Sequence, residues 1–339
     1  MTEIILAGPY TSALTHFAGF GLTSILEEAR CHGLRLRWSE DPEPRMSIRG
    51  PDDMAGSFGE VVRDHARRHA EVRSWVQQVA TVQRGKKSVE VGLFSPRIAA
   101  PESAHAWEEL YAKRRAALDD PINQSWLDAR MLQALGEPAY WQFGTKNAQY
   151  DGGASRWEMK TRNRGEDFVR NRLAHLAQVV ESREPDVIEK AFTDAAVDDS
   201  ARKPDSRTGT GLVPPGPVDD AVAWCALWGI SAFRLYPRLT GVAITPGAWP
   251  TDRVHPGLMA LPMHTTLQTP AKLRRVLRSQ DFSTSAFGDP EGRDGITVVG
   301  ARERLVRQGI RGIVKFPIRK AGSSSAPERQ VLSGTFEPF

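Results

Sequence analysis

The sequence predicts an α+β fold that mixes antiparallel hairpins with packed helices and has room for two subdomains. Segments with strand periodicity occur as neighbouring pairs, and segments with helical periodicity do not alternate regularly with them. A polar segment rich in proline and glycine, residues 198–217, divides the chain. We therefore expect an N-terminal α+β domain over 1–197, a linker or mobile loop over 198–217, and a C-terminal α+β domain over 218–339.

The first third of the chain predicts a strand, a long helix, a hairpin and a second helix. Apolar residues of the first helix recur at i, i+3 and i+4, and its internal glycines indicate close packing against another element. The hairpin alternates with period two, and an aspartate caps the second helix. The expected elements are a strand over 3–7, a helix over 11–33, a hairpin over 34–50, a helix over 52–78 and a strand over 86–96.

The later elements follow from the same two periodicities. The segment after the linker is apolar on every side, which predicts a buried helix. The expected elements are helices over 102–118 and 121–135, strands over 139–144 and 155–160 around a polar segment, a helix over 166–181, a buried helix over 219–230, short strands near 233–245 and 258–263, basic helices over 270–278 and 300–308, and closing strands over 310–319 and 329–336.

Composition excludes several classes of protein. The chain has 339 residues, of which 40% are hydrophobic and 25% charged, enough to bury a sizeable core. Its longest apolar run, 221–230, is shorter than the roughly 20 residues that span a bilayer. The N-terminus lacks the basic region of a secretory signal. Cys31 and Cys225 lie far apart beside apolar residues, so we expect buried thiols and a cytoplasmic protein without a membrane partner.

Positive charge is concentrated in two blocks of the chain. Residues 270–320 hold 12 Lys and Arg against 5 Asp and Glu, and residues 146–172 hold 7 against 4, although the whole chain carries a net charge of only +4. Cations gathered in this way are typical of proteins that bind polyanions, because neutralised phosphates release counterions. The charge distribution therefore favours a nucleic-acid-binding protein.

The middle block contains the segment SRWEMKTRNRG, residues 155–165. Its cations alternate along the chain, so an extended backbone would point them to one side. A helix beginning after this segment would offer its N-terminal amides to an anion. We expect a grip on a phosphate backbone here, made by Arg156, Lys160, Arg162, Asn163 and Arg164. The alternative is a solvated edge strand whose cations block aggregation.

The same segment permits a metal-dependent nuclease as an alternative. Asp151, Glu158 and Lys160 form a loose acid, then acid–x–lysine pattern, in which two carboxylates would hold a divalent ion and the lysine would face the attacked phosphate. This pattern is common by chance, and Asp151 lies in a glycine-rich turn. A cross-strand ion pair explains Glu158 and Lys160 equally well, so the phosphate grip is the favoured interpretation.

No other segment indicates catalysis. The chain has no phosphate-binding glycine loop, no nucleophile elbow and no CxxC pair. His65 and His69 are one helical turn apart, but no third metal ligand is evident and a solvated helix face is the favoured interpretation. We therefore expect no catalytic residue, no metal site and no cofactor.

The C-terminal block predicts a basic stripe on a helix. Lys272, Arg275 and Arg278 are spaced at i, i+3 and i+6, on the side opposite to the apolar residues of the same segment. The complete set of predicted nucleic-acid contacts is Lys86, Lys87, Lys146, Arg156, Lys160, Arg162, Asn163, Arg164, Lys272, Arg275 and Arg278. The tryptophans that fit core positions are Trp38, Trp75, Trp107, Trp126, Trp224 and Trp228. Trp141 and Trp157 lie in the basic segment and could stack on bases, although core packing is the favoured interpretation for them too.

Three segments, in this order, carry a resemblance to a known family. They are THFAGFGLTSILEEA near the start, ASRWEMKTRNRGEDFV in the middle, and DDAVAWCALWGISAFRLYP after the predicted linker. Together they resemble the compact large-subunit-like proteins of type I-U (I-G) CRISPR effector complexes, which belong to the Cascade class of assemblies. None of the three segments is catalytic.

The resemblance implies a subunit without enzymatic activity that works in antiviral defence. Such subunits lie beside the 5′ end of the guide RNA, help to recognise the motif that flanks the target, and open the duplex. The implied partners are target double-stranded DNA, guide RNA, other effector subunits and a helicase-nuclease recruited in trans. In such complexes, the target sequence is recognised largely by base pairing with the guide RNA and not by the protein. A third alternative is a structural assembly subunit whose basic faces meet acidic proteins.

Overall fold

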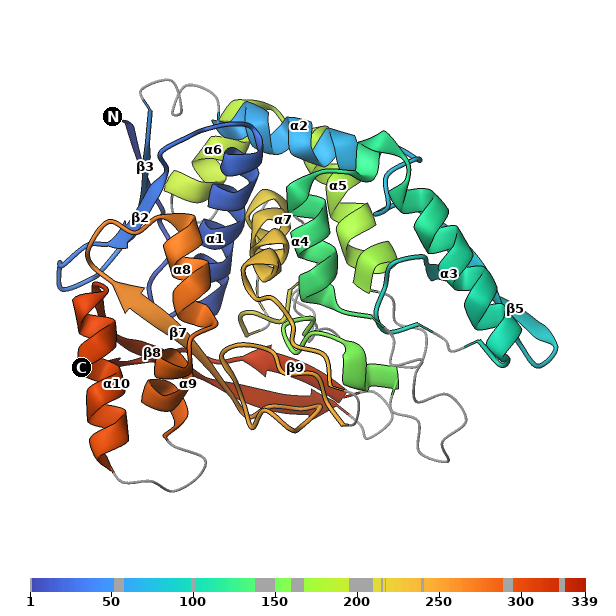
Figure 1. The fold of residues 1–339 in the computed structure, drawn as a ribbon. Coiled ribbons are helices and arrows are strands. Elements are labelled where there is room, and N and C mark those ends of the chain that lie inside the picture. Colours follow the sequence, from blue (N-terminus) through green and yellow to red (C-terminus); the bar gives the residue numbers. More distant parts are fainter. Residues whose placement is uncertain are drawn as a thin grey trace.

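Two buried helices, α1 (Ala13–Glu28) and α7 (Asp220–Trp228), lie side by side at the centre of the fold (Figure 1). Their backbones touch at glycines: a Cβ on Gly21 would lie 1.7 Å from the carbonyl oxygen of Cys225, and one on Gly229 would lie 2.1 Å from that of Phe17. Only glycine permits this approach, so the predicted close packing of the first helix is confirmed.

The computed structural model confirms the predicted α+β class, with helices and several antiparallel sheets. It describes residues 2–51, 58–98, 101–137, 150–159, 168–194, 210–214, 216, 218–238, 241–288, 295–322 and 327–339.

The N-terminal sheet has three antiparallel strands in the order β1-β3-β2, namely β1 (Thr2–Ile5), β3 (Met46–Gly50) and β2 (Arg35–Trp38). Ile4 and Leu36 are both paired with Ile48, and all three side chains are buried. The alternation that predicted the hairpin over 34–50 therefore places one face of the sheet in the core.

The larger sheet has five strands and lies below α1 and α7 in the view of Figure 1. β8 (Ile310–Gly322) is its central strand and pairs with three of the other four strands along its length. The predicted strands over 258–263 and 310–319 are confirmed, whereas 329–336 divides into two strands. The partners of β8 are β10 (Thr335–Pro338), β7 (Leu258–His264) and β9 (Pro327–Val331), and β6 (Ala248–Trp249) pairs with β7.

Side-chain caps begin several of the remaining helices. Ser103, Ser125 and Thr269 each accept a hydrogen bond from a backbone N–H in the first turn of the helix that follows. The full set of remaining helices, capped and uncapped, is α2 (Phe58–Ala70), α3 (Ala104–Leu118), α4 (Trp126–Leu135), α5 (Ala174–Glu181), α6 (Pro185–Thr193), α8 (Pro270–Leu277), α9 (Gln280–Phe287) and α10 (Gly295–Arg307).

Three predicted elements were wrong. The helix expected over 52–78 ends at Ala70, and a hairpin of β4 (Val79–Arg84) and β5 (Lys87–Gly92) follows it. In the turn after α2, the N–H of Trp75 donates to the side chain of Asn123 and not to a helical carbonyl. Residues 155–159 form no strand, and the described residues of 233–245 make an isolated bridge in place of the expected strands.

The predicted domains share buried surface around α1 and α7. Phe17 of α1 stacks on Phe233 with 4.8 Å between ring centroids. Residues 210–212, at the end of the predicted linker, are packed: Leu212 is buried, and the carbonyl of Gly211 accepts a hydrogen bond from Val331 N. Residues 198–209 of the predicted linker lie outside the described residues, as does the predicted strand over 139–144. Of the helices that the structure describes, none has the length and hydropathy needed to cross a bilayer.

Candidate nucleic-acid interface

Helix α8 separates apolar and basic side chains as its sequence predicts. Thr269 caps its N-terminus by accepting from the N–H of Lys272 at 3.1 Å, and Pro270 occupies the first turn. Leu273, Val276 and Leu277 are buried, whereas Lys272, Arg275 and Arg278 are exposed. We call these three cations the α8 stripe. Their predicted placement on one side of a helix is confirmed.

The charge of the α8 stripe is not compensated by acids within the described part of the chain. No ion pair joins Lys272, Arg275 or Arg278 to a described carboxylate. The one hydrogen bond that their side chains make to a described residue runs from Arg278 Nε to the carbonyl of Arg274, at 3.1 Å. Arg274, on the inner flank of the same helix, pairs instead with Glu27 at 2.9 Å. The outer cations are therefore available to a polyanion.

A pocket of about 320 Å³ adjoins α8, and we call it the α8 pocket. Arg35, Arg130 and Arg274 line it, with Glu27 as the one lining acid. Trp126 also lines it and is 43% exposed, so its predicted place in the core was wrong. Its ring instead receives the Arg130 guanidinium, 4.0 Å from the centroid.

The three arginines that line the α8 pocket exceed the one acid among its lining residues, so the pocket carries an excess of positive charge. The pKa of Arg130 is lowered to about 9, mainly by burial and also by the charge of Arg274, whereas Glu27 acts in the opposite direction. A bound anion would relieve this repulsion. The i, i+4 spacing of Trp126 and Arg130 on α4 was a sequence signal for this contact that the core interpretation missed.

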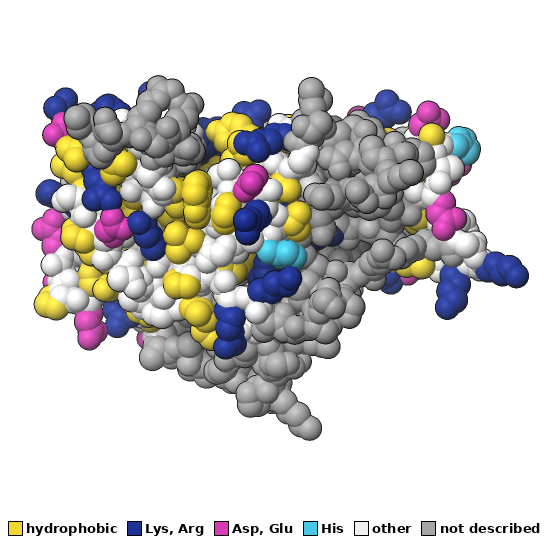
Figure 2. Space-filling view, turned by 90° about the horizontal axis from the view of Figure 1, so that it is seen from below, with side chains coloured by type: hydrophobic (Ala, Val, Ile, Leu, Met, Phe, Trp, Pro, Cys, Tyr) yellow, Lys and Arg dark blue, Asp and Glu magenta, His cyan; other side chains and the backbone are white. Residues whose placement is uncertain are grey.

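Exposed cations continue on β8 and α10. Within the described residues, no acid pairs with Arg307, Arg311 or Lys320, whereas Arg304 pairs with Asp281 at 2.7 Å. Basic side chains are interspersed with hydrophobic ones across the described part of the face in Figure 2. The C-terminal block thus keeps much of its charge on the surface.

The middle block behaves differently. Arg156 is 1% exposed, donates from Nε to the carbonyl of Ala154 at 3.1 Å, and donates from Nη1 to that of Val254 at 3.0 Å. Its predicted role as a phosphate contact was wrong, because residues 155–159 are buried on all sides and not extended along an edge.

Two further buried arginines donate hydrogen bonds to the backbone of this segment. Arg329 donates to the carbonyl of Arg156 at 3.0 Å, and Arg97 donates to that of Ser155 at 2.9 Å. The segment therefore receives guanidinium groups from distant parts of the chain. These are bonds to backbone carbonyls, which a hydrophobic pattern in the sequence does not reveal.

The residues of the nuclease alternative are only partly described. Glu158 is 2% exposed, and its Oε1 lies 3.7 Å from Nη1 of Arg97. Lys160 and the side chain of Asp151 lie outside the described residues. A carboxylate that is buried against an arginine is poorly placed to reach a phosphate in solution.

The other predicted contacts are placed as follows. Lys86 and Lys87 are exposed at the turn between β4 and β5, at the end of the fold remote from α8 (Figure 1). Lys146, Arg162, Asn163 and Arg164 lie outside the described residues, so their part in a phosphate grip stays a prediction.

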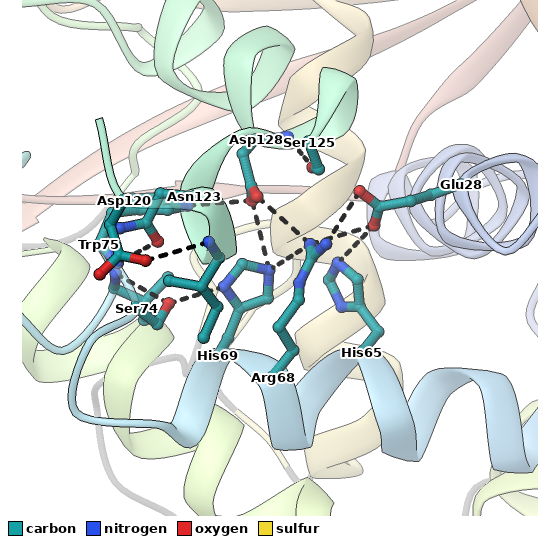
Figure 3. A network of polar contacts seen from close by, with 12 residues as sticks. Glu28, His65, Arg68, His69, Ser74, Trp75, Asp120, Asn123, Ser125 and Asp128 are labelled. Carbon is teal, nitrogen blue, oxygen red and sulfur yellow. Dashed lines mark hydrogen bonds and ion pairs between the residues drawn. The ribbon is translucent and has the colours of Figure 1, made fainter. Parts of the chain in front are cut away.

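The two histidines of α2 belong to a buried polar network (Figure 3). His65 and His69 are 7% and 0% exposed, so the predicted solvated helix face was wrong. Arg68 links Glu28 at the end of α1 to Asp128 on α4, with Nη2–O distances of 3.2 and 3.3 Å. Nε2 of His69 lies 3.3 Å from Oδ1 of Asp128. This network joins α1, α2 and α4.

Burial sets the protonation of this network. It lowers the pKa of both imidazoles well below the ordinary value, and the charge of Arg68 lowers them further. Burial also raises the pKa of Asp128 to about 6, against the opposing effects of Arg68 and a hydrogen bond from Trp75. Because His65, His69 and Asp128 are closed off from solvent, we assign the network a structural role. Across the described residues, no group of three or more His, Cys, Asp and Glu side chains is arranged to hold a metal ion.

The predicted tryptophan core is otherwise confirmed for the described residues, with Trp38, Trp75, Trp107, Trp224 and Trp228 buried. Trp157 is fully buried and donates to the carbonyl of Pro246 at 3.1 Å, so it packs in the core, as favoured over base stacking. Trp141 lies outside the described residues. Cys225 is buried as expected, and Cys31 is half-buried.

Comparison with known proteins identifies no relative: no protein family model matches this chain, and no curated protein matches its sequence.

Proposed function

We propose that the protein is a non-catalytic, nucleic-acid-binding subunit of a CRISPR RNA-guided DNA surveillance complex. Its role there is to help recognise the motif that flanks the target and to open the duplex. Its partners are target double-stranded DNA, guide RNA and the other effector subunits, with a helicase-nuclease recruited in trans, and it acts in the cytoplasm. The resemblance of three sequence segments supports the choice of complex.

The α8 stripe is the observation that carries the nucleic-acid-binding part of this proposal. Lys272, Arg275 and Arg278 are exposed on one side of a helix that a buried apolar side anchors. Cations at this spacing can follow a phosphate backbone, and releasing its counterions supplies affinity that does not depend on sequence. The α8 pocket beside the stripe adds Arg130 and the half-exposed ring of Trp126.

Salt dependence tests the proposal with the full-length protein. Anisotropy would measure the affinity for a fluorescent duplex of about 20 base pairs while the salt concentration rises from about 50 to 200 mM. We expect the affinity to fall at least roughly tenfold over that range, because several phosphate contacts are lost. An affinity that did not change with salt would contradict the proposal.

A triple variant locates the contact. Changing Lys272, Arg275 and Arg278 together to Ala should weaken binding similarly for every DNA sequence and should flatten the salt dependence. The matched control removes three exposed cations of α2, α3 and α6, Arg67→Ala with Lys113→Ala and Lys190→Ala. Equal losses in both triple variants would mean that only net charge matters and that α8 is not the interface.

The same samples separate the two alternative functions. A metal-dependent nuclease that uses Asp151, Glu158 and Lys160 would cleave a plasmid when magnesium is added, and Glu158→Gln would abolish cleavage while binding survived. A structural assembly subunit would show no affinity for nucleic acid at any salt concentration. We expect binding without cleavage.

A further inference from the structure

A second and larger pocket, of about 740 Å³, lies against a different side of α4 from the α8 pocket. Ser125, Ala129 and Leu132 of the α4 segment line it, whereas Trp126 and Arg130 line the α8 pocket. Its other walls come from α3 and the segment after η5 (Gly229–Ala232). Because Arg114, Arg115 and Arg234 surround it, we call it the arginine pocket.

Positive charge exceeds negative charge in the arginine pocket. Glu137 is the one acid among its lining residues, and it already accepts a hydrogen bond from the Tyr111 hydroxyl at 2.5 Å. Arg115 and Arg234 are exposed, and no ion pair joins either of them to an acid in the described part of the chain. An anion entering this pocket would therefore meet a net positive field.

Arg114 is the buried cation of the pocket wall. It is 6% exposed, and its guanidinium lies between two rings, 5.2 Å from the centroid of Phe94 and 5.7 Å from that of Tyr111. Its nearest approach to Glu137 is 3.9 Å, and its Nη1 makes no hydrogen bond to any described residue. A buried donor without an acceptor is costly, so an incoming anionic oxygen would stabilise this arrangement.

The remaining lining favours a ligand with a flat, apolar part. Leu118, Leu132, Leu235 and Pro237 form an apolar wall, and Leu118 is 38% exposed at its edge. The volume falls within the range of about 300–1,000 Å³ typical of small-molecule sites. Guanidinium groups match the geometry of phosphate oxygens, and an apolar wall accommodates a base that has left its stack.

We propose that the arginine pocket binds one unstacked nucleotide of a single strand, with the base on the apolar wall and its phosphate facing Arg114, Arg115 and Arg234. The strand reaches the pocket from the α8 stripe by crossing α4, which forms a wall of both pockets. The inference rests on the proposed function, since the α8 stripe supplies the path. It adds a site at which single-stranded and duplex nucleic acid are distinguished.

The test compares single-stranded and duplex DNA of about 12 nucleotides by anisotropy, with pocket variants of the full-length protein. Arg115→Ala with Arg234→Ala removes the two exposed phosphate contacts, and Ala129→Glu places a negative charge at an exposed position of the pocket. We expect each change to weaken single-strand binding roughly tenfold, as for lost charge-assisted contacts, with duplex binding changed less than about twofold.

Matched controls carry the same charge changes outside the pocket. Arg67→Ala with Lys113→Ala removes two exposed cations, and Ala116→Glu adds an acid at an exposed position of α3. We expect both controls to bind single strands like the wild type. All changed positions are exposed, and circular dichroism would verify that the variants are folded.

The outcomes separate this inference from the proposed function. If pocket variants and controls bound single strands equally well, the nucleotide pocket would be wrong even where the α8 triple variant lost duplex binding. If the α8 triple variant bound duplex normally, the proposed function would fail instead. If the pocket variants lost binding only to an acidic, tyrosine-containing peptide, the pocket would be a protein-docking site and the inference would be overturned.

Discussion

The two basic blocks of this chain have similar sequence signals and opposite structural outcomes. In the C-terminal block, Lys272, Arg275 and Arg278 are exposed and meet no described acid. In the middle block, Arg156 is buried and bonds to backbone carbonyls, and Arg170 pairs with Glu90 at 2.7 Å. A surplus of cations in a segment therefore does not by itself indicate a surface that binds phosphate.

The difference lies in how apolar residues are spaced within each block. In α8 they recur with helical period, so one side is buried and the cations must occupy the other. Residues 155–159 have no such division, and every side chain there is buried. An amphipathic helix specifies the exposure of its own cations, whereas an irregular segment depends on what covers it.

The largest expected effect is that of mild acid on four buried histidines, which lie outside both basic blocks. Burial lowers the pKa of His16 to about 4 and of His264 to about 3, and it lowers those of His65 and His69 well below the ordinary value. The unfolded chain therefore binds more protons below pH 6.5, and stability falls as the pH falls. Each histidine contributes about 1.4 kcal/mol per pH unit to this loss.

Over part of that pH range, protonation of Asp128 changes the stability in the opposite direction to the histidines. Its pKa is raised to about 6, so the folded state binds this proton more tightly than the unfolded state does, and stability gains as the pH falls from about 6 to 4. We expect a net loss of several kcal/mol between pH 6.5 and 5, measured by urea unfolding. His264→Gln should reduce the slope and the exposed control His105→Gln should not. A flat profile would contradict the burial of these imidazoles.

Arg156→Ala should give the next largest effect. Removing the guanidinium leaves the carbonyls of Ala154 and Val254 without their donor in the interior, which should lower the free energy of unfolding by about 3 kcal/mol. DNA affinity per folded molecule should stay unchanged. A variant with normal stability and weakened DNA binding would restore the original interpretation of the middle block.

Arg275→Glu should have the opposite pattern to Arg156→Ala, with weaker DNA binding and unchanged stability. Reversing one charge on the outer side of α8 should weaken duplex binding by about 1–2 kcal/mol, or roughly tenfold, with no loss of stability. Lys113→Glu, on the exposed side of α3, is the matched control. Anisotropy and thermal unfolding of the same samples would measure both quantities, and equal affinities for the two variants would exclude α8 as the interface.

Changing Lys86 and Lys87 together to Ala should have the smallest effect. Both lysines are exposed, but the β4–β5 turn projects at the far end of the fold from α8 (Figure 1). We expect a loss below about threefold in duplex affinity, typical of a peripheral charge. A loss as large as that of the α8 triple variant would extend the interface along the whole molecule.

Much of the fold could be predicted because its signals are local. The hairpin over 34–50, the buried helix over 219–230 and the α8 stripe each follow from periodicity within a single segment. The turn that follows α2 could not be predicted, because Trp75 bonds there to Asn123, which is distant in the sequence. Sequence spacing carries no information about such long-range hydrogen bonds.

The candidate site was predicted only where it depends on one helix. The α8 pocket and the arginine pocket each combine α4 with segments distant in the sequence, such as Arg35 and Arg234. Arg114 stands between Lys113 and Arg115 in α3, and a charge count does not distinguish these three cations. Its importance arises from burial between Phe94 and Tyr111, which only the folded chain shows.

The glycine contact between α1 and α7 has a consequence for biosynthesis. Gly21 meets Cys225, so α1 leaves the ribosome roughly 200 residues before its partner is made, a delay of about 10–40 s at the usual 5–20 residues per second. During that interval the apolar surface of α1 has no native cover from α7. Nascent chains should therefore depend on chaperones, and the folding rate should be limited by a contact of very high sequence separation.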